Sequence, residues 1–255
     1  MSGFEGPSRL HRTVCPRTRC IVAPHSGFSN LGGSGEDPGP PLRVLPVASS
    51  VMTQRSPCWR SLVPDILVAC TANIARSPLL AVLLQSHVDR RLGEGRTLVG
   101  SAGVAARIGD PAATGSRMVA EDWGLSLDDH RSQPLPYVPL DEVSLVVAMT
   151  RHHAREVASK HSHPERVFVL RELVALAALL LGDGTIDEIA AAASGPQDRL
   201  VRVVTEADQR RSRRRLRRRY DVPDPIGGDK EVYAALGEEF AEAGEVLADA
   251  LFGPA

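Results

Sequence analysis

Short apolar runs alternate with longer amphipathic stretches along the chain from residue 65 onward. The run Asp65–Ala69 (DILVA) is typical of a strand that is buried on both faces. The next stretch, Ser77–Leu92, has apolar residues at helical spacing. Pro78 stands just inside its start, where the missing N–H costs nothing. Residues 65–92 are therefore predicted to form a strand, a loop and a helix.

The same alternation continues to the end of the chain. Further strands are predicted at Leu98–Gly103, Val143–Met149 and Arg166–Leu170, and further helices at Ala113–Gly124, Arg151–Lys160, Glu172–Leu181 and Asp229–Leu251. Strands that alternate with helices indicate a parallel sheet with helices on both faces. We therefore predict an α/β fold with a four-stranded parallel sheet, joined by right-handed crossovers.

Residues 1–61 lack this patterning. The first 60 residues hold 8 prolines, 7 glycines and 8 serines, and such a segment cannot bury enough apolar surface to offset the entropy of ordering. It is rich in arginine and poor in acids, as targeting peptides are, but it has no apolar region with a small-residue cleavage site. We interpret it as a disordered tail or as the product of a start assigned upstream of Met52. Residues 62–253 are the predicted folded domain.

Composition excludes several other classes of protein. The net charge of −1 gives no general attraction to DNA or membranes, and no apolar stretch approaches the roughly 20 residues of a membrane-spanning helix. The four cysteines are Cys15, Cys20, Cys58 and Cys70, so a disulfide framework across the fold is excluded. The Cys15 and Cys20 pair has no second pair with which to build a zinc site.

Candidate chemistry lies where the first strand ends, at Cys70. In open parallel sheets, sites form at the carboxyl ends of the strands, and a loop that leads into a helix presents backbone N–H groups to an anion. The same field favours the nucleophilic thiolate of Cys70. Arg76 can grip two phosphoryl oxygens, Ser77 can donate to the thiolate, and Asn73 tolerates a left-handed turn. A core thiol beside a surface cation is the simpler alternative, but it does not account for the Ser-Pro helix start.

The sequence ACTANIARSP, residues 69–78, resembles the signature loop of the low-molecular-weight protein tyrosine phosphatases. Other segments resemble that family in the same order: Ser101–Gly103, His130–Ser132, Leu145–Met149 and Asp221–Pro225. The resemblance covers about residues 62–182 and 220–252. The signature loop and the late Asp-Pro are specific to the family, and the other matches support them.

The resemblance implies a role for each matching residue. Cys70 would attack phosphorus to form a phosphocysteine, and Arg76 with the loop amides would hold the phosphoryl oxygens. Asp224 would protonate the leaving oxygen and then activate water, a contribution of roughly 10²–10⁴-fold. Asp221 is the local rival, but only Asp224 is followed by the proline of the motif. The implied phosphate-binding loop includes Thr71, Ala72, Asn73, Ile74, Ala75 and Ser77, with Ser101 and His130 behind it.

Three features depart from the family pattern. Ala75 stands where many members carry a second cysteine, and Ile226 follows the Asp-Pro where aromatic residues are frequent. Residues 183–219 enlarge the chain before the Asp-Pro loop and contain a helix-like piece at Ile186–Ala193. The block Arg210–Arg219 holds eight arginines and is interpreted as a solvated face or as a patch for an acidic partner. No aromatic residues interleave it, so stacking on a single-stranded nucleic acid is not supported, and no nucleic acid is expected as a partner.

Together these features predict a cytoplasmic phosphomonoester hydrolase, a protein phosphatase that needs no metal or other cofactor. Its substrate would be protein phosphotyrosine or another aryl phosphate, held as a phosphorylated protein or a small molecule, and no membrane partner is expected. One alternative is an arsenate reductase of the same fold that uses a small external thiol, since no cysteine follows Cys70. A second alternative is a non-catalytic module that binds phosphorylated ligands.

Overall fold

Four parallel strands form the centre of the molecule. The computed structural model describes residues 63–211 and 220–255, which belong to one compact unit, Met52–Ala255. The strands are β1 (Ile66–Cys70), β2 (Val99–Gly103), β3 (Leu145–Ala148) and β4 (Val167–Val169). They lie in the order β2-β1-β3-β4, and each pairing is parallel. The predicted four-stranded parallel sheet is confirmed.

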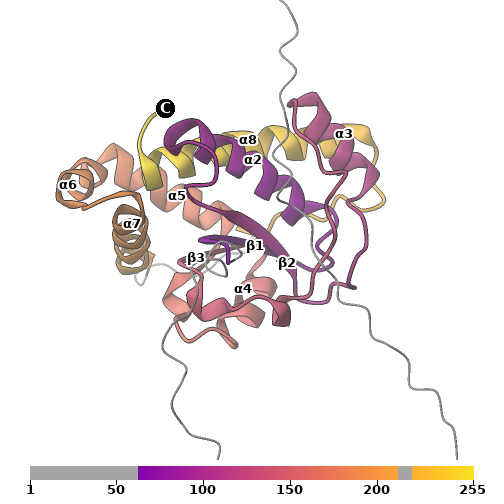
Figure 1. The fold of residues 1–255 in the computed structure, drawn as a ribbon, viewed down its shortest axis with the longest axis horizontal. Coiled ribbons are helices and arrows are strands. Elements are labelled where there is room, and N and C mark those ends of the chain that lie inside the picture. Colours follow the sequence, from indigo (N-terminus) through magenta and orange to yellow (C-terminus); the bar gives the residue numbers. More distant parts are fainter. Residues whose placement is uncertain (1–62, 212–219) are drawn as a thin grey trace, which may run out of the picture. The chain divides into compact units, whose positions relative to one another are not determined.

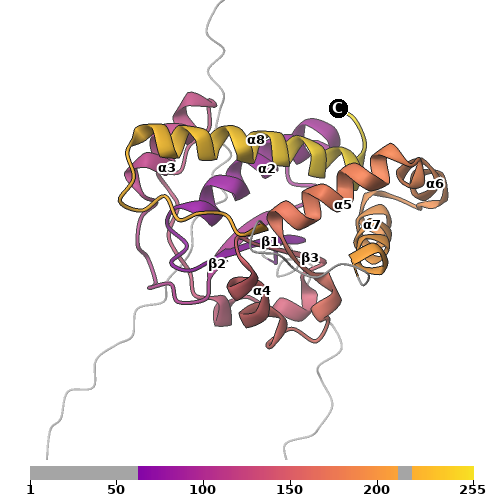
Figure 2. The same ribbon diagram turned by 180° about the vertical axis from the view of Figure 1, so that it is seen from behind.

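Helices cover both faces of the sheet. The helices are α2 (Arg76–Leu92), α3 (Thr114–Asp122), α4 (Arg151–Ala158), α5 (Leu170–Gly182), α6 (Thr185–Ala192), α7 (Pro196–Arg211) and α8 (Lys230–Phe252). Short 3-10 helices are η1 (Leu135–Tyr137), η2 (Leu140–Glu142) and η3 (Pro164–Arg166). Figures 1 and 2 show α2, α5 and α8 on one face and α4 on the other.

The side chains of β1 alternate between two apolar cores. Ile66 and Val68 pack into the larger core with α2, α5 and α8, whereas Leu67 and Ala69 pack into the smaller core beside α4. All five residues of β1 are buried, which is why this strand reads as an unbroken apolar run. Packing on both faces therefore fixes the position of β1 and of Cys70 at its end.

The enlargement at residues 183–219 contains one helix that the sequence analysis did not predict. Helix α6 matches the predicted helix-like piece, but α7 was not predicted. Its buried residues, Leu200, Val203, Val204 and Ala207, follow helical spacing, although they are separated by many charged side chains. The predicted tail, residues 1–61, lies outside the described residues, and so do positions 212–219 of the arginine block.

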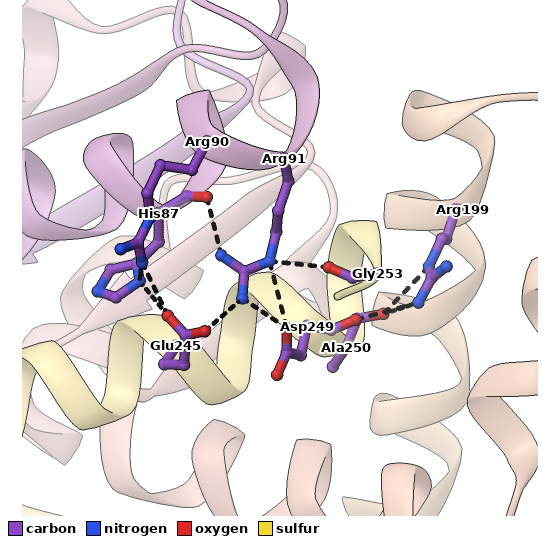
Figure 3. Close-up of polar contacts among 8 residues, drawn as sticks. All are labelled: His87, Arg90, Arg91, Arg199, Glu245, Asp249, Ala250 and Gly253. Carbon is purple, nitrogen blue, oxygen red and sulfur yellow. Dashed lines mark hydrogen bonds and ion pairs between the residues drawn. The ribbon is translucent and has the colours of Figure 1, made fainter. Parts of the chain in front are cut away.

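Polar contacts hold the end of α8 against α2 (Figure 3). The guanidinium of Arg91 is almost fully buried. It donates to Glu245 at 2.8 Å and to the carbonyl oxygen of Gly253 at 2.8 Å. Arg199 of α7 donates to the carbonyl oxygen of Ala250. Because α2 begins directly after the candidate loop, these contacts also stabilise the helix that supports that loop.

Candidate active site

The candidate loop lies at the point where the strand order reverses. Strand β1 has β2 on one side and β3 on the other, and its carboxyl end leads through residues 71–75 into α2. Open parallel sheets form their sites at such a point. Backbone N–H groups from the connection after β2 hold the loop, since Ala105 donates to Thr71 and Ala113 donates to Ile74.

Gly103, at the end of β2, lets this connection pass close to the loop. A Cβ atom at this position would lie 2.4 Å from the carbonyl oxygen of Thr71, and that oxygen is backbone that cannot swing away. The glycine of the Ser-Ala-Gly segment is therefore required by the close approach of two backbones.

Asn73 holds the loop together from inside. Its φ of 56° is left-handed, as the sequence predicted, and its backbone N–H points at the sulfur of Cys70 at 3.3 Å. Its side-chain amide donates to Ser77 at 2.9 Å and to Ser101 at 2.8 Å. Its side-chain oxygen accepts from the backbone N–H of Gln133 at 2.9 Å. The buried asparagine therefore joins the loop to α2, to β2 and to the segment after α3.

The sulfur of Cys70 lies 2.9 Å from the hydroxyl oxygen of Ser77. Ser77 accepts a hydrogen bond from Asn73, so its own proton is free to point at the sulfur. Cys70 is 2% exposed and is the free cysteine of the described ranges. A hydroxyl donor and a backbone N–H both stabilise negative charge on this sulfur, as the predicted nucleophile requires.

Arg76 connects the loop to the Asp-Pro segment. Its guanidinium is buried, donates to the carbonyl oxygen of Val222 at 3.2 Å and forms an ion pair with Asp224 at 2.7 Å. The carboxylate of Asp224 is about half exposed. The structure thus brings Cys70, Arg76 and Asp224 to one place, although Asp224 stands 148 positions beyond Arg76 in the sequence.

Asp221 faces a different partner. Its carboxylate accepts from the backbone N–H of Arg151 at 2.8 Å and from the guanidinium of the same residue at 3.1 Å. It therefore anchors the Asp-Pro segment to the start of α4, whereas Asp224 reaches the loop. The two carboxylates therefore have different partners, and the role of Asp224 as the acid stays a prediction.

Ser101 and His130 both contact the loop, as the resemblance implied. The Nε2 of His130 donates to the carbonyl oxygen of Asn73 at 2.7 Å. Burial lowers the pKa of His130 below its ordinary value, and the carbonyl acceptor opposes that shift. Both residues hold Asn73 in its left-handed conformation.

His153 is a further contact that the sequence analysis did not predict. It lies in the first turn of α4, and its Nε2 is 2.8 Å from the hydroxyl of Thr71. Burial, together with the nearby charge of Arg76, lowers its pKa to about 4. The available signal was the polar run Thr150–His153 directly after a buried strand, because such positions border the site in a parallel sheet.

Residues 63–211 and 220–255 contain no group of three or more histidine, cysteine or acidic side chains arranged to hold a metal ion. No helix within these ranges is both long and apolar enough to cross a membrane.

Comparison with known proteins places the chain in a family. Residues 65–180 match the family described as low molecular weight phosphotyrosine protein phosphatase. A probable low molecular weight protein-tyrosine-phosphatase, EpsP of Ralstonia solanacearum, is 32% identical over 113 residues, which are 44% of this chain and 74% of the relative. A protein-arginine-phosphatase of Geobacillus stearothermophilus is 32% identical over 187 residues, which are 73% of this chain and 95% of the relative.

Solved structures agree with this placement. The low molecular weight protein tyrosine phosphatase from T. tengcongensis is 25% identical, with a TM-score of 0.51 over 71% of this chain and 95% of that one. A YwlE mutant from Bacillus subtilis is 26% identical, with a TM-score of 0.50 over 73% of this chain and 97% of that one. The chain belongs to the low molecular weight phosphotyrosine protein phosphatase family. It is a hydrolase with phosphatase function.

Proposed function

We propose that the chain removes phosphoryl groups from proteins through a phosphocysteine on Cys70, and that phosphotyrosine or another aryl phosphate is its substrate. The observation that carries the proposal is the ion pair between Arg76 and Asp224 at 2.7 Å beside the loop that holds Cys70. The ion pair supports the proposal because Arg76 and Asp224, the proposed anion-binding fork and acid, then lie beside the proposed nucleophile. A non-catalytic phosphate-binding module would have no use for the acid.

The first chemical step joins the substrate to Cys70. The phosphoryl group takes the place of Asp224 on the guanidinium of Arg76, and its negative charge favours the protonated carboxyl. A bond forms between Sγ and phosphorus while the bond from phosphorus to the leaving oxygen breaks. Asp224 gives its proton to that oxygen, so the alcohol or phenol leaves as a neutral molecule.

The second step releases phosphate. Water attacks phosphorus and gives a proton to Asp224, and the bond between phosphorus and sulfur breaks. Cys70 leaves as a thiolate, which the hydroxyl of Ser77 stabilises at 2.9 Å. The cycle restores both the thiolate and the protonated acid, so no external reductant or thiol is consumed. An arsenate reductase of this fold would need such a thiol.

Ile226 lies next to the proposed acid. It follows the Asp-Pro pair, is about half exposed, and its backbone N–H donates to Asp224 at 3.3 Å. An apolar side chain next to the acid offers a surface on which a ring can pack. The aliphatic residue at this position is thus compatible with a phosphotyrosine ring, although it supplies less ring-to-ring contact than an aromatic residue.

Phosphoarginine is the second candidate substrate. Protein-arginine-phosphatases of Bacillus subtilis and Geobacillus stearothermophilus are 34% and 32% identical to the chain over the matched residues. In phosphoarginine the leaving atom is a guanidine nitrogen, which also leaves more readily with a proton. The same Cys70 and Asp224 would therefore serve both reactions, so the two substrates are distinguished by their kcat/KM values.

The test compares two phosphopeptides of identical sequence, one with phosphotyrosine and one with phosphoarginine. We expect phosphate release from the phosphotyrosine peptide with the larger kcat/KM, and no release from either peptide by Cys70→Ser. A larger kcat/KM for the phosphoarginine peptide would contradict the aryl assignment and favour the second candidate. Arsenate reduction with a small thiol, in the absence of phosphatase turnover, would overturn the proposed function.

Two further expectations stay predictions. A cytoplasmic location is the first of them. An acidic partner of Arg210–Arg219 would have to compete for Arg210 with Glu206 and Asp183 of the same chain. Arg211 pairs with Asp208 and lies over the ring of Phe168, so these two arginines are not a free solvated face.

A further inference from the structure

Helix α4 is hydrogen-bonded to the phosphate-binding loop through His153, a side chain that the proposed chemistry does not use. His153 is 3% exposed, and its two ring nitrogens contact two hydroxyl groups. Nε2 lies 2.8 Å from Thr71, the residue next to Cys70, and Nδ1 lies 3.0 Å from Thr150, the residue that caps α4. The ring therefore bridges the loop and the helix on the opposite face of the sheet from α2 (Figure 1).

Thr150 needs no help from the ring to cap the helix. Its hydroxyl oxygen accepts the backbone N–H of His153, which is the usual N-cap bond. The hydroxyl proton is then free to point at Nδ1, which leaves Nε2 as the nitrogen that donates to Thr71. The imidazole thus links the capped end of α4 to Thr71 of the loop through two hydrogen bonds.

Thr71 has few other restraints. Its carbonyl oxygen accepts from Ala105, which holds the backbone from the side of β2. Residues farther along the loop are held by Asn73 and its partners, but these contacts do not include the side chain of Thr71. The hydroxyl contact with His153 holds the loop from the side of β3 and α4. Because Thr71 follows Cys70, this contact restrains the peptide group that joins the two residues.

We propose that His153 is a positioning residue, which holds Thr71 and so sets the direction in which Cys70 presents its sulfur to phosphorus. The inference rests on the proposed function, because it concerns the geometry of attack by Cys70. The bond to Thr71 aligns the reacting atoms and does not bind the substrate. Its loss should therefore lower kcat and leave KM nearly unchanged.

The neutral form of the ring suits this role. Burial and the guanidinium of Arg76 keep the imidazole uncharged at neutral pH. An uncharged ring donates with one nitrogen and accepts with the other, which satisfies both hydroxyls. It also adds no positive charge that would compete with Arg76 for the phosphoryl group.

The test compares two substitutions of His153 whose side-chain amides differ in their distance from the backbone. In His153→Gln the side-chain amide can extend to the position of Nε2 and restore the contact with Thr71. In His153→Asn the amide reaches only the position of Nδ1, so it keeps the contact with Thr150 and loses the one with Thr71. His153→Ala loses both contacts. His152→Ala is the matched control, since His152 is the exposed neighbour on the same helix.

With an aryl phosphate as substrate, we expect kcat to fall about tenfold in His153→Ala and His153→Asn, the size of a lost hydrogen bond of roughly 1.4 kcal/mol. His153→Gln should retain most of the wild-type kcat, and His152→Ala should match the wild type. Thr71→Val should lower kcat as His153→Ala does, and the double variant should lose no more than either single variant. Melting temperatures measured alongside separate a loss of fold from a loss of rate.

Several results would overturn the inference. One is a kcat in His153→Ala equal to that of His152→Ala. Others are equal rates in the Gln and Asn variants, or additive losses in the double variant. If the wild type is active and Cys70→Ser is inactive in the same assay, these results contradict only the role of His153 and leave the proposed function intact. An inactive wild type would instead overturn the proposed function, and this inference with it.

Discussion

Asp221 and Asp224 lie three positions apart and have different partners. Asp224 pairs with Arg76 at the loop, and Asp221 pairs with Arg151 at the start of α4. The sequence distinguished them by a motif, since only Asp224 precedes the proline of the Asp-Pro pair. The polar run after the predicted third strand marked the neighbourhood of His153, but its contact with Thr71 could not be predicted, because that contact depends on how β1 and β3 are paired.

At the residue scale, Asp224→Asn should slow turnover in proportion to how poor the leaving group is. With phenyl phosphate we expect a loss within the roughly 10²–10⁴-fold contribution of a positioned acid. With a nitro-substituted aryl phosphate the loss should be much smaller, because that phenolate leaves without a proton. The measurement is kcat/KM for both substrates in the wild type and the variant, because kcat/KM reports the step in which the leaving group departs, whereas kcat also includes the hydrolysis of the phosphocysteine.

Asp221→Asn is the matched control for this comparison. It weakens a partly exposed ion pair, so it should cost about 1 kcal/mol of unfolding free energy. The ratio of the kcat/KM values for the two substrates should stay at the wild-type level. Equal losses on both substrates in Asp224→Asn, or a changed ratio in Asp221→Asn, would show that Asp224 is not the acid.

At the scale of elements, the predictions succeeded where apolar patterning was strong. Each predicted strand is present. The ends of the predicted helices lie within two residues of the observed ends. Helix α8 begins at Lys230 because Asp229 caps it, with its side chain accepting from the N–H of Val232. Helix α7 was missed because its apolar stripe is narrow and lies among many charged residues.

Gly237 lets α8 approach α3 closely. A Cβ atom at this position would lie 2.3 Å from a methyl carbon of Val119, whose β-branched side chain has little freedom to move. Gly237→Ala should gain up to about 1 kcal/mol in helix propensity and lose about 1–3 kcal/mol to overpacking, so the net effect should be a loss. The measurement is the free energy of unfolding in urea.

Gly182→Ala is the control for the propensity gain alone. Apart from its chain neighbours and the adjacent backbone of α5, no atom lies within 4 Å of the position that its Cβ would take, at the end of α5. This variant should be as stable as the wild type or more stable by about 0.4–1 kcal/mol. A Gly237→Ala protein that is as stable as Gly182→Ala would show that α8 and α3 are not in close contact there.

At the scale of the whole molecule, four histidines make stability depend on pH. Burial is the main reason that the pKa values of His87, His130, His153 and His161 lie below the ordinary 6.5. The unfolded chain binds protons at these side chains near pH 6.5, and the folded protein binds them only at lower pH. The free energy of unfolding should therefore fall as the pH is lowered from about 7.5 to about 5.

Urea denaturation across this pH range measures the effect. His153→Gln should weaken the dependence, because one of the four groups then no longer titrates. A free energy of unfolding that stays constant or rises on acidification would contradict the assigned pKa directions.

The central claim is that turnover passes through a phosphoryl group on Cys70. The most direct measurement is an acid quench of the enzyme during turnover of an aryl phosphate, followed by peptide mass spectrometry. We predict one phosphoryl group on the peptide that contains Cys70, more of it in Asp224→Asn with a nitro-substituted substrate, and none in Cys70→Ser. An actively turning over wild type without phosphorylated Cys70, or a Cys70→Ser variant with near wild-type turnover, would contradict the claim.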